Sequence, residues 1–461
     1  MSEPYDLLIR HGEVILPGGR QRVDIAVRDG RIAAIAPAID GTAIRTIDAS
    51  GMQVFPGVID PHTHMGIPIK TTTSADDFRT GSEAAASGGV TTILDFTVQK
   101  PGESPTSALE RRLGAAESGC RIDYAVHVNL TDRQAHWLPQ IPDLIAAGHT
   151  SFKVFSTYRD AGMMIDWTDF RTVLETIHRH GGLLMLHAED NGIVERETAR
   201  HVSAGYRSPI WHARSRPAEA EAEAIRVAAA IAGELGARLY IVHLSSAAGL
   251  AAALSARRQG ARLILETCPQ YLLLDESRFD GPRGHDFIAT PPLRTAADRE
   301  ALWEALADGS IDTIGTDHCP FTRAQQDEWE GRFDRAPNGL PGVATSFPLL
   351  FTHGVVSGRI SAERLAELTA TAPARHFGID SRKGRIAVGT DADLLIWDPE
   401  APATLHAADI PGAADWSPYE GWPVAGSVAW TILRGRPVFI RGALQPFAPG
   451  EWVAAVPDAS F

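Results

Sequence analysis

Apolar residues follow two different rhythms along the chain, and these divide it into a central part and two flanking parts. Residues 5–56 contain short apolar runs, and Asp29-Gly30 between two of them is a strong hairpin signal. Residues 384–397 and 430–440 repeat this pattern of short strands. Because the two ends of a chain often lie close together, we predict one small β-sheet unit built from both ends.

The central part alternates helical patterns with strand-like apolar runs. Helices are predicted over residues 74–87, 169–180, 218–235, 247–259 and 296–307, and glycine follows most of them as a stop signal. Strands are predicted at 90–95, 183–187, 239–243, 263–267 and 311–315. This alternation predicts parallel strands joined by helices. A closed eightfold barrel fits the number of strands and helices, and an open doubly wound sheet fits the same alternation of strands and helices.

We therefore predict an α/β protein with a TIM-like (β/α)8 barrel and a small β-sandwich domain formed by both chain ends. The barrel is assigned to residues 56–375. The β-sandwich domain is assigned to residues 1–55 plus 376–461, including a C-terminal extension. A chain of 461 residues has room for a barrel of about 250 to 400 residues and a smaller partner.

Charge and cysteine content narrow the range of partners and compartments. The net charge is −14 and no basic cluster offsets it, which argues against nucleic acid as a partner. No apolar run approaches the ~20 residues of a membrane span, and the N-terminus does not resemble a signal peptide. Three scattered cysteines fit a reducing compartment. We therefore expect a cytoplasmic protein without a membrane segment.

A pair of histidines stands at the end of the first central strand. The apolar run at residues 54–59 leads into Asp60-Pro61-His62-Thr63-His64. Side chains alternate along a strand, so His62 and His64 point to the same side. Two adjacent imidazoles suit a divalent metal, although a His-x-His pair by itself is more often incidental.

Three further strand ends carry residues of the same kind. The runs at 183–186, 239–242 and 311–316 lead into His187, His243 and Asp317. The C-terminal ends of the strands form the active site of a barrel, so four strands would deliver His or Asp to one rim. One such residue would be unremarkable, but four in the same position favour a metal centre.

Lys153 lies inside the apolar run 151–155, where a charged amine is costly unless it is paired or modified. One interpretation is an ion pair with a nearby carboxylate. The other is addition of carbon dioxide to the amine, which gives a carbamate with two oxygens that can bridge two metal ions. The local sequence leaves both interpretations open.

Taken together, these residues resemble the dihydropyrimidinase and hydantoinase branch of the amidohydrolase superfamily, the cyclic amidohydrolases. The resemblance covers nearly the whole chain and includes the string Gly315-Thr-Asp-His-Cys-Pro320. The other matching strings are residues 55–64, 151–155, 187–189, 216–223, 242–245, 266–272, 291–294 and 337–342.

The resemblance implies a site with two divalent metal ions, usually zinc. His62, His64 and Asp317 would hold one ion, and His187 and His243 the other. Lys153, as N6-carboxylysine, would bridge them. Binuclear sites of this kind also accept manganese, cobalt or iron.

Catalytic and substrate-binding roles also follow from the resemblance. Asp317 would transfer the proton, and the Tyr158 hydroxyl would stabilise the oxyanion. Thr290 and Asn338 would bind the ring amides. The assembly would be a homotetramer or at least a dimer.

The implied reaction opens a cyclic amide ring to an N-carbamoyl amino acid. The sequence does not choose between 5-substituted hydantoins and dihydropyrimidines. It departs from the family pattern at Thr290, where serine is more usual, at 344–347 and in the loop 65–70. We expect an apolar pocket for the ring substituent, lined by Met65, Ile67, Ile69 and Phe155.

Related activities fit less well. A dihydroorotase-like enzyme would place arginine where Gly66 stands, and a mononuclear deaminase would place glutamate soon after His243. An allantoinase-type hydrolase remains an alternative, although such enzymes resemble the chain less around Tyr158. A non-catalytic scaffold relative would have lost metal ligands, and here all six positions are filled.

Overall fold

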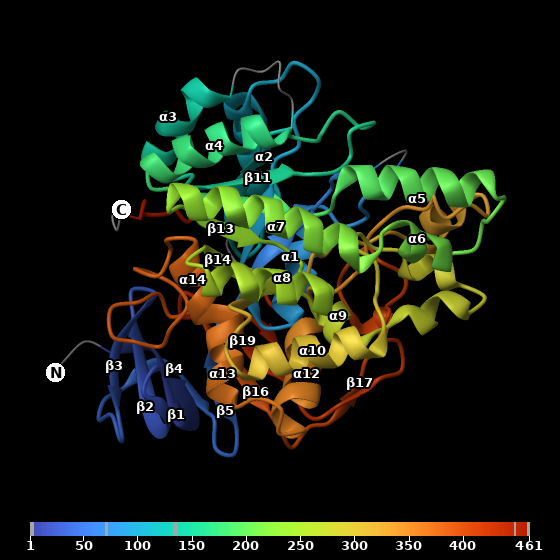
Figure 1. Cartoon of the computed structure of the whole chain (residues 1–461). Helices are drawn as coiled ribbons and strands as arrows, with labels where there is room; N and C mark the ends of the chain where they lie inside the picture. Colours follow the sequence, from blue (N-terminus) through green and yellow to red (C-terminus); the bar gives the residue numbers. More distant parts are fainter. Residues whose placement is uncertain (1–3, 70–71, 132–136, 447–448, 459–461) are drawn as a thin grey trace.

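The computed structural model describes residues 4–69, 72–131, 137–446 and 449–458 and contains two large β-sheets (Figure 1). The first has eight parallel strands that follow one another in chain order. They are β6 (Val58–Thr63), β9 (Val90–Phe96), β10 (Asp123–Asn129), β11 (Ser151–Phe155), β12 (Leu183–His187), β13 (Arg238–Ile241), β14 (Arg262–Thr267) and β15 (Thr313–Ile314).

Polar contacts join the first and last strands of this sheet, β6 and β15. The Asp60 carboxylate accepts hydrogen bonds from the Thr316 amide (3.0 Å) and hydroxyl (2.5 Å). The His64 amide donates to the His318 carbonyl at 2.9 Å, next to a parallel bridge between Thr63 and His318. The sheet therefore curves into a nearly closed barrel, which confirms the predicted TIM-like fold and excludes the open sheet.

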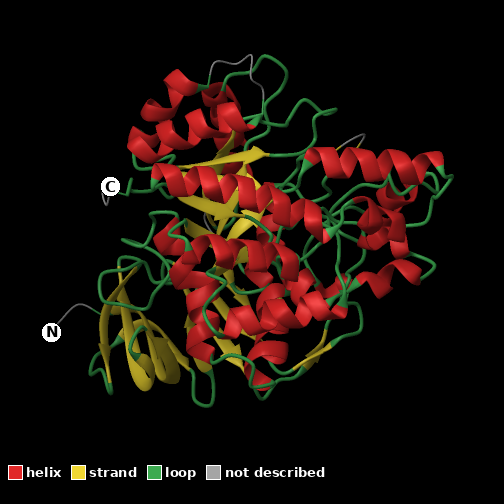
Figure 2. Cartoon of the chain, in the orientation of Figure 1, coloured by secondary structure: helices red, strands yellow, loops and turns green. Residues whose placement is uncertain are grey.

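Helices surround the barrel strands (Figure 2). The predicted helices are α1 (Phe78–Ser87), α4 (Trp167–Arg179), α7 (Ala218–Leu235), α8 (Ala247–Arg258) and α10 (Ala296–Ala307). The others are α2 (Pro105–Gly119), α3 (Ile141–Ala146), α5 (Asn191–Ser203), α6 (Ile210–Ser215), α9 (Pro269–Leu273), α11 (Arg323–Gln326), α12 (Ser346–Leu350), α13 (Ala362–Ala366) and α14 (Ala372–His376). Within the described ranges, no helix is long and apolar enough to cross a membrane.

Helix α1 begins later than the sequence pattern predicts. Asp77 is its N-cap, and its carboxylate accepts hydrogen bonds from the amides of Arg79 and Thr80. Ser74 instead donates its hydroxyl to the His64 carbonyl at 2.7 Å. The segment before the helix therefore supports the loop that follows the histidine pair.

The second sheet combines both ends of the chain, as predicted. From the N-terminal part come β1 (Tyr5–Leu16), β2 (Gly19–Arg28), β3 (Arg31–Ala36), β4 (Ala43–Asp48) and β5 (Gln53–Pro56). From the C-terminal part come β16 (Leu394–Asp398), β19 (Ser427–Leu433), β20 (Arg436–Ile440) and β21 (Ala443–Leu444). Strand β5 pairs in parallel with β1 and antiparallel with β16, so it joins the two contributions.

The C-terminal extension runs back to the barrel. The Tyr124 amide in β10 donates to the Glu451 carbonyl, and the Val453 amide donates to the Tyr124 carbonyl. The Trp452 ring stacks on His149 with the ring centres 4.8 Å apart. The Asp458 amide donates to the carbonyl of Gly181. Residues 449–458 thus pack against the end of the barrel where the strands begin, and the predicted boundaries at 55/56 and 375/376 remain predictions.

A buried ionic cluster connects the two sheets. The Lys383 ammonium lies against Asp123 at the start of β10, and its distances to Asp391 and Asp393 before β16 are 3.0 and 2.7 Å. The three carboxylates are close enough to hold a metal ion, but the ammonium lies among them. Burial lowers the pKa of Lys383, and the carboxylates raise it further, so the pKa lies above its ordinary value and the side chain is charged.

We predict that Lys383→Met lowers the free energy of unfolding by about 3–5 kcal/mol, because removing one partner leaves buried carboxylates without their counter-charge. Chemical denaturation followed by circular dichroism measures this loss. Lys100→Met is the matched control, because Lys100 is exposed and its loss should change stability by less than about 0.5 kcal/mol. Equal stability of the two variants would contradict the structural role of Lys383.

Candidate metal centre and active site

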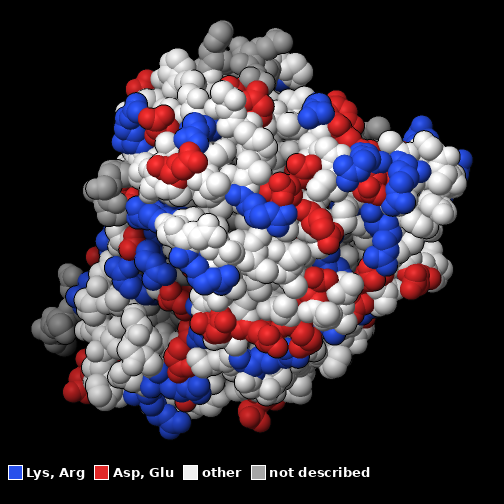
Figure 3. Space-filling view, in the orientation of Figure 1, with Lys and Arg blue, Asp and Glu red and all other residues white. Residues whose placement is uncertain are grey.

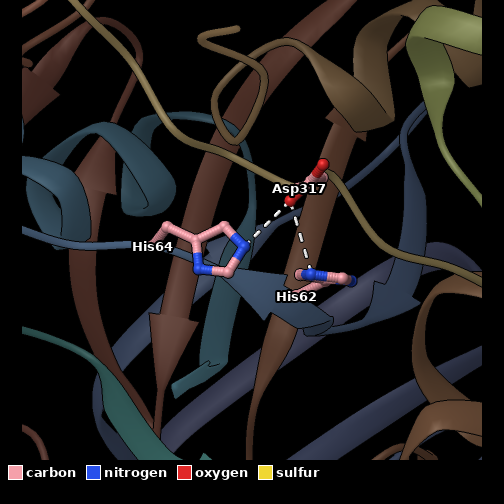
Figure 4. A group of neighbouring side chains, drawn as sticks. All are labelled: His62, His64 and Asp317. Atoms are coloured by element: carbon pink, nitrogen blue, oxygen red, sulfur yellow. Dashed lines mark ion pairs between the residues drawn. The ribbon is translucent and has the colours of Figure 1, made fainter. Parts of the chain in front are cut away.

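Three predicted ligands converge at the C-terminal end of the barrel. His62 and His64 come from the end of β6, and Asp317 follows β15 (Figure 4). One Asp317 carboxylate oxygen lies 3.3 Å from His62 Nε2 and 2.9 Å from His64 Nε2. Imidazole nitrogens and a carboxylate oxygen at these separations match the ligand set of a divalent metal such as zinc.

Burial and neighbouring charges put His62 and Asp317 in the form that binds a metal. Desolvation lowers the pKa of His62 well below its ordinary value, so its imidazole is neutral. Burial raises the pKa of Asp317, but His62 and His64 lower it further, and the net pKa lies far below the usual range. A neutral imidazole and an ionised carboxylate both have a free lone pair for a cation.

Lys153 lies beside this cluster on β11 and is 2 % exposed. Its Nζ atom is 3.0 Å from His62 Nε2 and 4.2 Å from the centre of the Phe96 ring. Within the described ranges, no ion pair joins Lys153 to a carboxylate at contact distance, so the first of the two sequence interpretations gains no support. Burial lowers the pKa of its amine to about 8, which increases the fraction of neutral, nucleophilic amine.

His187 and His243 form a second pair of imidazoles. His187 Nδ1 and His243 Nε2 lie 3.0 Å apart, and the His243 ring centre is 5.4 Å from that of His62. His187 Nε2 is 2.7 Å from the Glu189 carboxylate, which also pairs with Arg216. Burial lowers the pKa of both imidazoles, so His187 and His243 are neutral and can act as ligands.

The predicted catalytic and substrate-binding residues lie next to this second pair. The Tyr158 ring centre is 5.2 Å from that of His187, and Thr290 lies close enough to the Tyr158 hydroxyl to influence its pKa. The side-chain amide of Asn338 donates a hydrogen bond to the Thr290 hydroxyl at 2.9 Å. The structure therefore brings Tyr158, Thr290 and Asn338 together with the histidines at one end of the barrel.

The predicted apolar pocket is only partly supported. The Phe155 ring lies 6.0 Å from Tyr158 and 5.6 Å from His187, as a pocket residue should. Met65 is fully buried and points to α1, since a Cβ on Gly81 would lie 2.2 Å from its sulfur. Met65 therefore belongs to the core beneath the loop.

Three site residues adopt backbone conformations that L-residues rarely adopt. The φ angles of Tyr158, His243 and Asp317 are 67°, 40° and 53°. A non-glycine residue in this region costs on the order of 1–3 kcal/mol and persists only where its surroundings hold it. Such residues concentrate at functional sites, which agrees with the position of all three at the end of a barrel strand.

Supporting residues were missed by the sequence reasoning. Glu266 accepts a hydrogen bond from His62 Nδ1 at 2.7 Å, and Glu189 contacts His187 Nε2 at the same distance. Arg216 pairs in turn with the Glu189 carboxylate. The signal was present, because all three lie in the strings that carry the family resemblance. His318 faces away from the cluster: its Nε2 atom bonds Asp76 at 3.1 Å, and its Nδ1 atom accepts the Gly342 amide.

The nearly closed barrel, with a His and Asp cluster at its C-terminal end that could hold a metal ion, is typical of barrel hydrolases. Residues 53–438 match the model of the amidohydrolase family, and the chain belongs to that family.

Relatives and solved structures narrow the group within the family. A D-hydantoinase from Rhizobium radiobacter is 40% identical over 95% of this chain and 96% of its own length. A D-phenylhydantoinase from Escherichia coli is 39% identical over 95% of both chains. The crystal structure of dihydropyrimidinase from Brevibacillus agri superposes with a TM-score of 0.95 at 35% identity, covering 98% of this chain and 99% of that one.

We predict that Glu266→Gln weakens metal binding by about 10-fold to 100-fold, because a neutral acceptor makes the His62 imidazole a poorer ligand. Competition with a chromophoric chelator measures the affinity. Glu363→Gln is the control, since Glu363 pairs with Arg20 on the surface, far along the chain from the cluster. An unchanged metal affinity in Glu266→Gln would refute the supporting role.

Proposed function

We propose that the protein hydrolyses the cyclic amide ring of 5-substituted hydantoins and dihydropyrimidines and releases N-carbamoyl amino acids. The observation that carries this proposal is the convergence of His62, His64 and Asp317 in a chain related over its whole length to hydantoinases. The neighbouring group of Tyr158, Thr290 and Asn338 supports it, because a ring amide needs both hydrogen-bond partners and a donor for the oxyanion.

The metal centre that we propose contains two divalent ions, most simply zinc. His62, His64 and Asp317 would hold the first and His187 and His243 the second, with Lys153 as N6-carboxylysine between them. Support comes from the short distances within each histidine group and from the position of Lys153 beside His62. Bound metal would supply an acidified water and polarise the ring carbonyl.

The chain's own residues would then handle charge and protons. Burial raises the pKa of Tyr158 to about 12, so its hydroxyl keeps the proton that it would donate to the developing oxyanion. Asp317, held as a carboxylate by the imidazoles, would accept a proton from the attacking water and deliver it to the leaving nitrogen. Thr290 and Asn338 would bind the ring amides and fix the orientation of the scissile bond.

Two properties of the working enzyme extend this proposal. A homotetramer or dimer is expected by analogy with the family. A cytoplasmic location agrees with three buried, unpaired thiols, which suit a reducing compartment. On the face shown in Figure 3, acidic and basic side chains are interspersed, as is common on protein surfaces.

Ring opening of 5,6-dihydrouracil and of a 5-aryl hydantoin should both be detectable on metal-loaded enzyme and should disappear after chelation. The Phe155 ring beside Tyr158 favours the aryl hydantoin, so we expect the higher kcat/KM for that substrate. Absorbance of the ring amide follows both reactions. Metal-dependent activity on neither ring would overturn the proposed substrate class.

Lys153→Ala should lose bound metal and activity together, because the bridge between the two histidine groups disappears. Elemental analysis and ring opening measure the two losses on the same sample. Tyr158→Phe is the matched contrast: it should keep its metal and lose about 10²- to 10³-fold in kcat, as for other oxyanion donors. A full metal load in Lys153→Ala would refute the bridging role.

A further inference from the structure

Residues 411–417, here called the 411–417 segment, lie against loops at the end of the barrel that holds the metal ligands. The segment belongs to the connection between β17 (Ala403–Thr404) and β18 (Pro423–Val424) in the C-terminal part of the chain (Figure 1). The Ala413 amide donates to Asp76 at 2.6 Å, and Asp415 accepts the Arg323 amide at 2.8 Å. A C-terminal segment outside the barrel strands is thus fastened to the active-site loops.

Trp416 is the side chain that this segment inserts between those loops. It is 3 % exposed, and its indole N–H donates to the Phe321 carbonyl at 2.8 Å. Its ring packs with Ala289 and Leu340 in a small separate apolar cluster. Ala289 directly precedes Thr290, and Leu340 comes two residues after Asn338, so the indole packs against a residue of each amide-binding loop.

The two amide-binding loops are also tied to each other. The Gly339 amide donates to the Ile288 carbonyl at 2.9 Å, and the Asn338 side chain donates to Thr290 at the same distance. On another side, His212 Nε2 lies 2.9 Å from the Ala289 carbonyl. The Thr290 loop is therefore held between His212 and the indole, and its position depends on the volume that Trp416 fills.

We propose that Trp416 is a positioning residue for amide recognition: it sets the placement of Thr290 and Asn338 by packing against Ala289 and Leu340. This inference rests on the proposed function, because it takes Thr290 and Asn338 as the groups that bind the ring amides. A smaller ring at position 416 lets both loops relax toward the gap. The amide-binding pair then shifts, while the metal ligands on the barrel strands keep their positions.

The chain offers a matched control in Trp303. Trp303 on α10 is equally buried, at 3 % exposure, and its indole N–H also donates to a carbonyl, that of Leu272, at 2.7 Å. Trp416→Phe and Trp303→Phe therefore remove the same indole N–H and a similar ring volume. Both should lower the melting temperature to a similar extent, and only Trp416→Phe touches the amide-binding loops.

For the test, kcat, KM and metal content are measured with the best ring substrate of the wild-type enzyme. We expect Trp416→Phe to raise KM by about 10-fold to 100-fold, because two hydrogen bonds to the ring amides weaken together, with full metal content and kcat changed much less. Trp303→Phe should keep the wild-type KM. In the background of Thr290→Ala, Trp416→Phe should add less to KM than it does alone, because the two changes act on the same contact.

A wild-type KM in Trp416→Phe, or the same KM rise in Trp303→Phe, would overturn the inference. If wild-type enzyme opens neither ring, the proposed function fails first, and the two failures are distinguishable. Should Trp416→Phe not fold, Asp415→Ala carries the test, since Asp415 is exposed and anchors the segment through the Arg323 amide. Its KM should rise in the same direction by a smaller factor, and an unchanged KM there would also refute the inference.

Discussion

The Glu266 carboxylate, buried inside the barrel at the end of β14, is the group on which the geometry of the site depends. One of its oxygens accepts hydrogen bonds from His62 Nδ1 and the His243 amide, and the other accepts the Tyr240 hydroxyl. With Nδ1 engaged, His62 can direct only Nε2 toward Asp317 and Lys153. Burial raises the pKa of Glu266 to about 7, although its three donors favour the charged form. A single buried acceptor thus links the two histidine groups and fixes one tautomer.

The barrel makes this arrangement possible because it brings distant parts of the chain to one rim. His62 and Glu266 are 204 positions apart, yet β6 and β14 end at the same level. Gly315 allows the close approach, since a Cβ there would lie 2.8 Å from the Cβ of His62. The strained backbones of His243 and Asp317 lie at this same rim, where only the surrounding structure can hold them. The residues proposed as metal ligands therefore lie within the barrel strands or at most three residues beyond their ends.

The sequence predicts best what a local repeat determines: the side of a strand to which a side chain points, and the residues at which a helix begins and ends. The alternation of a strand places His62 and His64 on one side, and helix stop signals locate α7 and α10 to the residue. The sequence does not predict the direction of a side chain that is set by contacts with residues far along the chain. Met65 follows the histidine pair, but the turn at Gly66 (φ 59°) and the space above Gly81 direct its side chain into the core. Likewise, no local pattern shows that Asp77 caps α1 while Ser74 bonds to His64. The role of Glu266 depends on a contact across the barrel, which no window of sequence contains.

The two halves of the site are stabilised by different kinds of interaction, and this has consequences for how specificity arises. The proposed metal site consists of carboxylates and imidazoles at the ends of barrel strands. Removing one of these partners leaves a charge without compensation. The residues proposed to bind the ring amides are Thr290 and Asn338, which are hydrogen bonded to each other. Their loops pack against Trp416, which belongs to a segment outside the barrel. Apolar packing tolerates substitutions that conserve volume at a modest cost, usually below about 1.5 kcal/mol. If Thr290 and Asn338 bind the ring as proposed, substitutions near Trp416 would move their loops and leave the proposed metal ligands in place. Substrate preference could then change through the C-terminal segment, while the barrel constrains the hydrolytic chemistry.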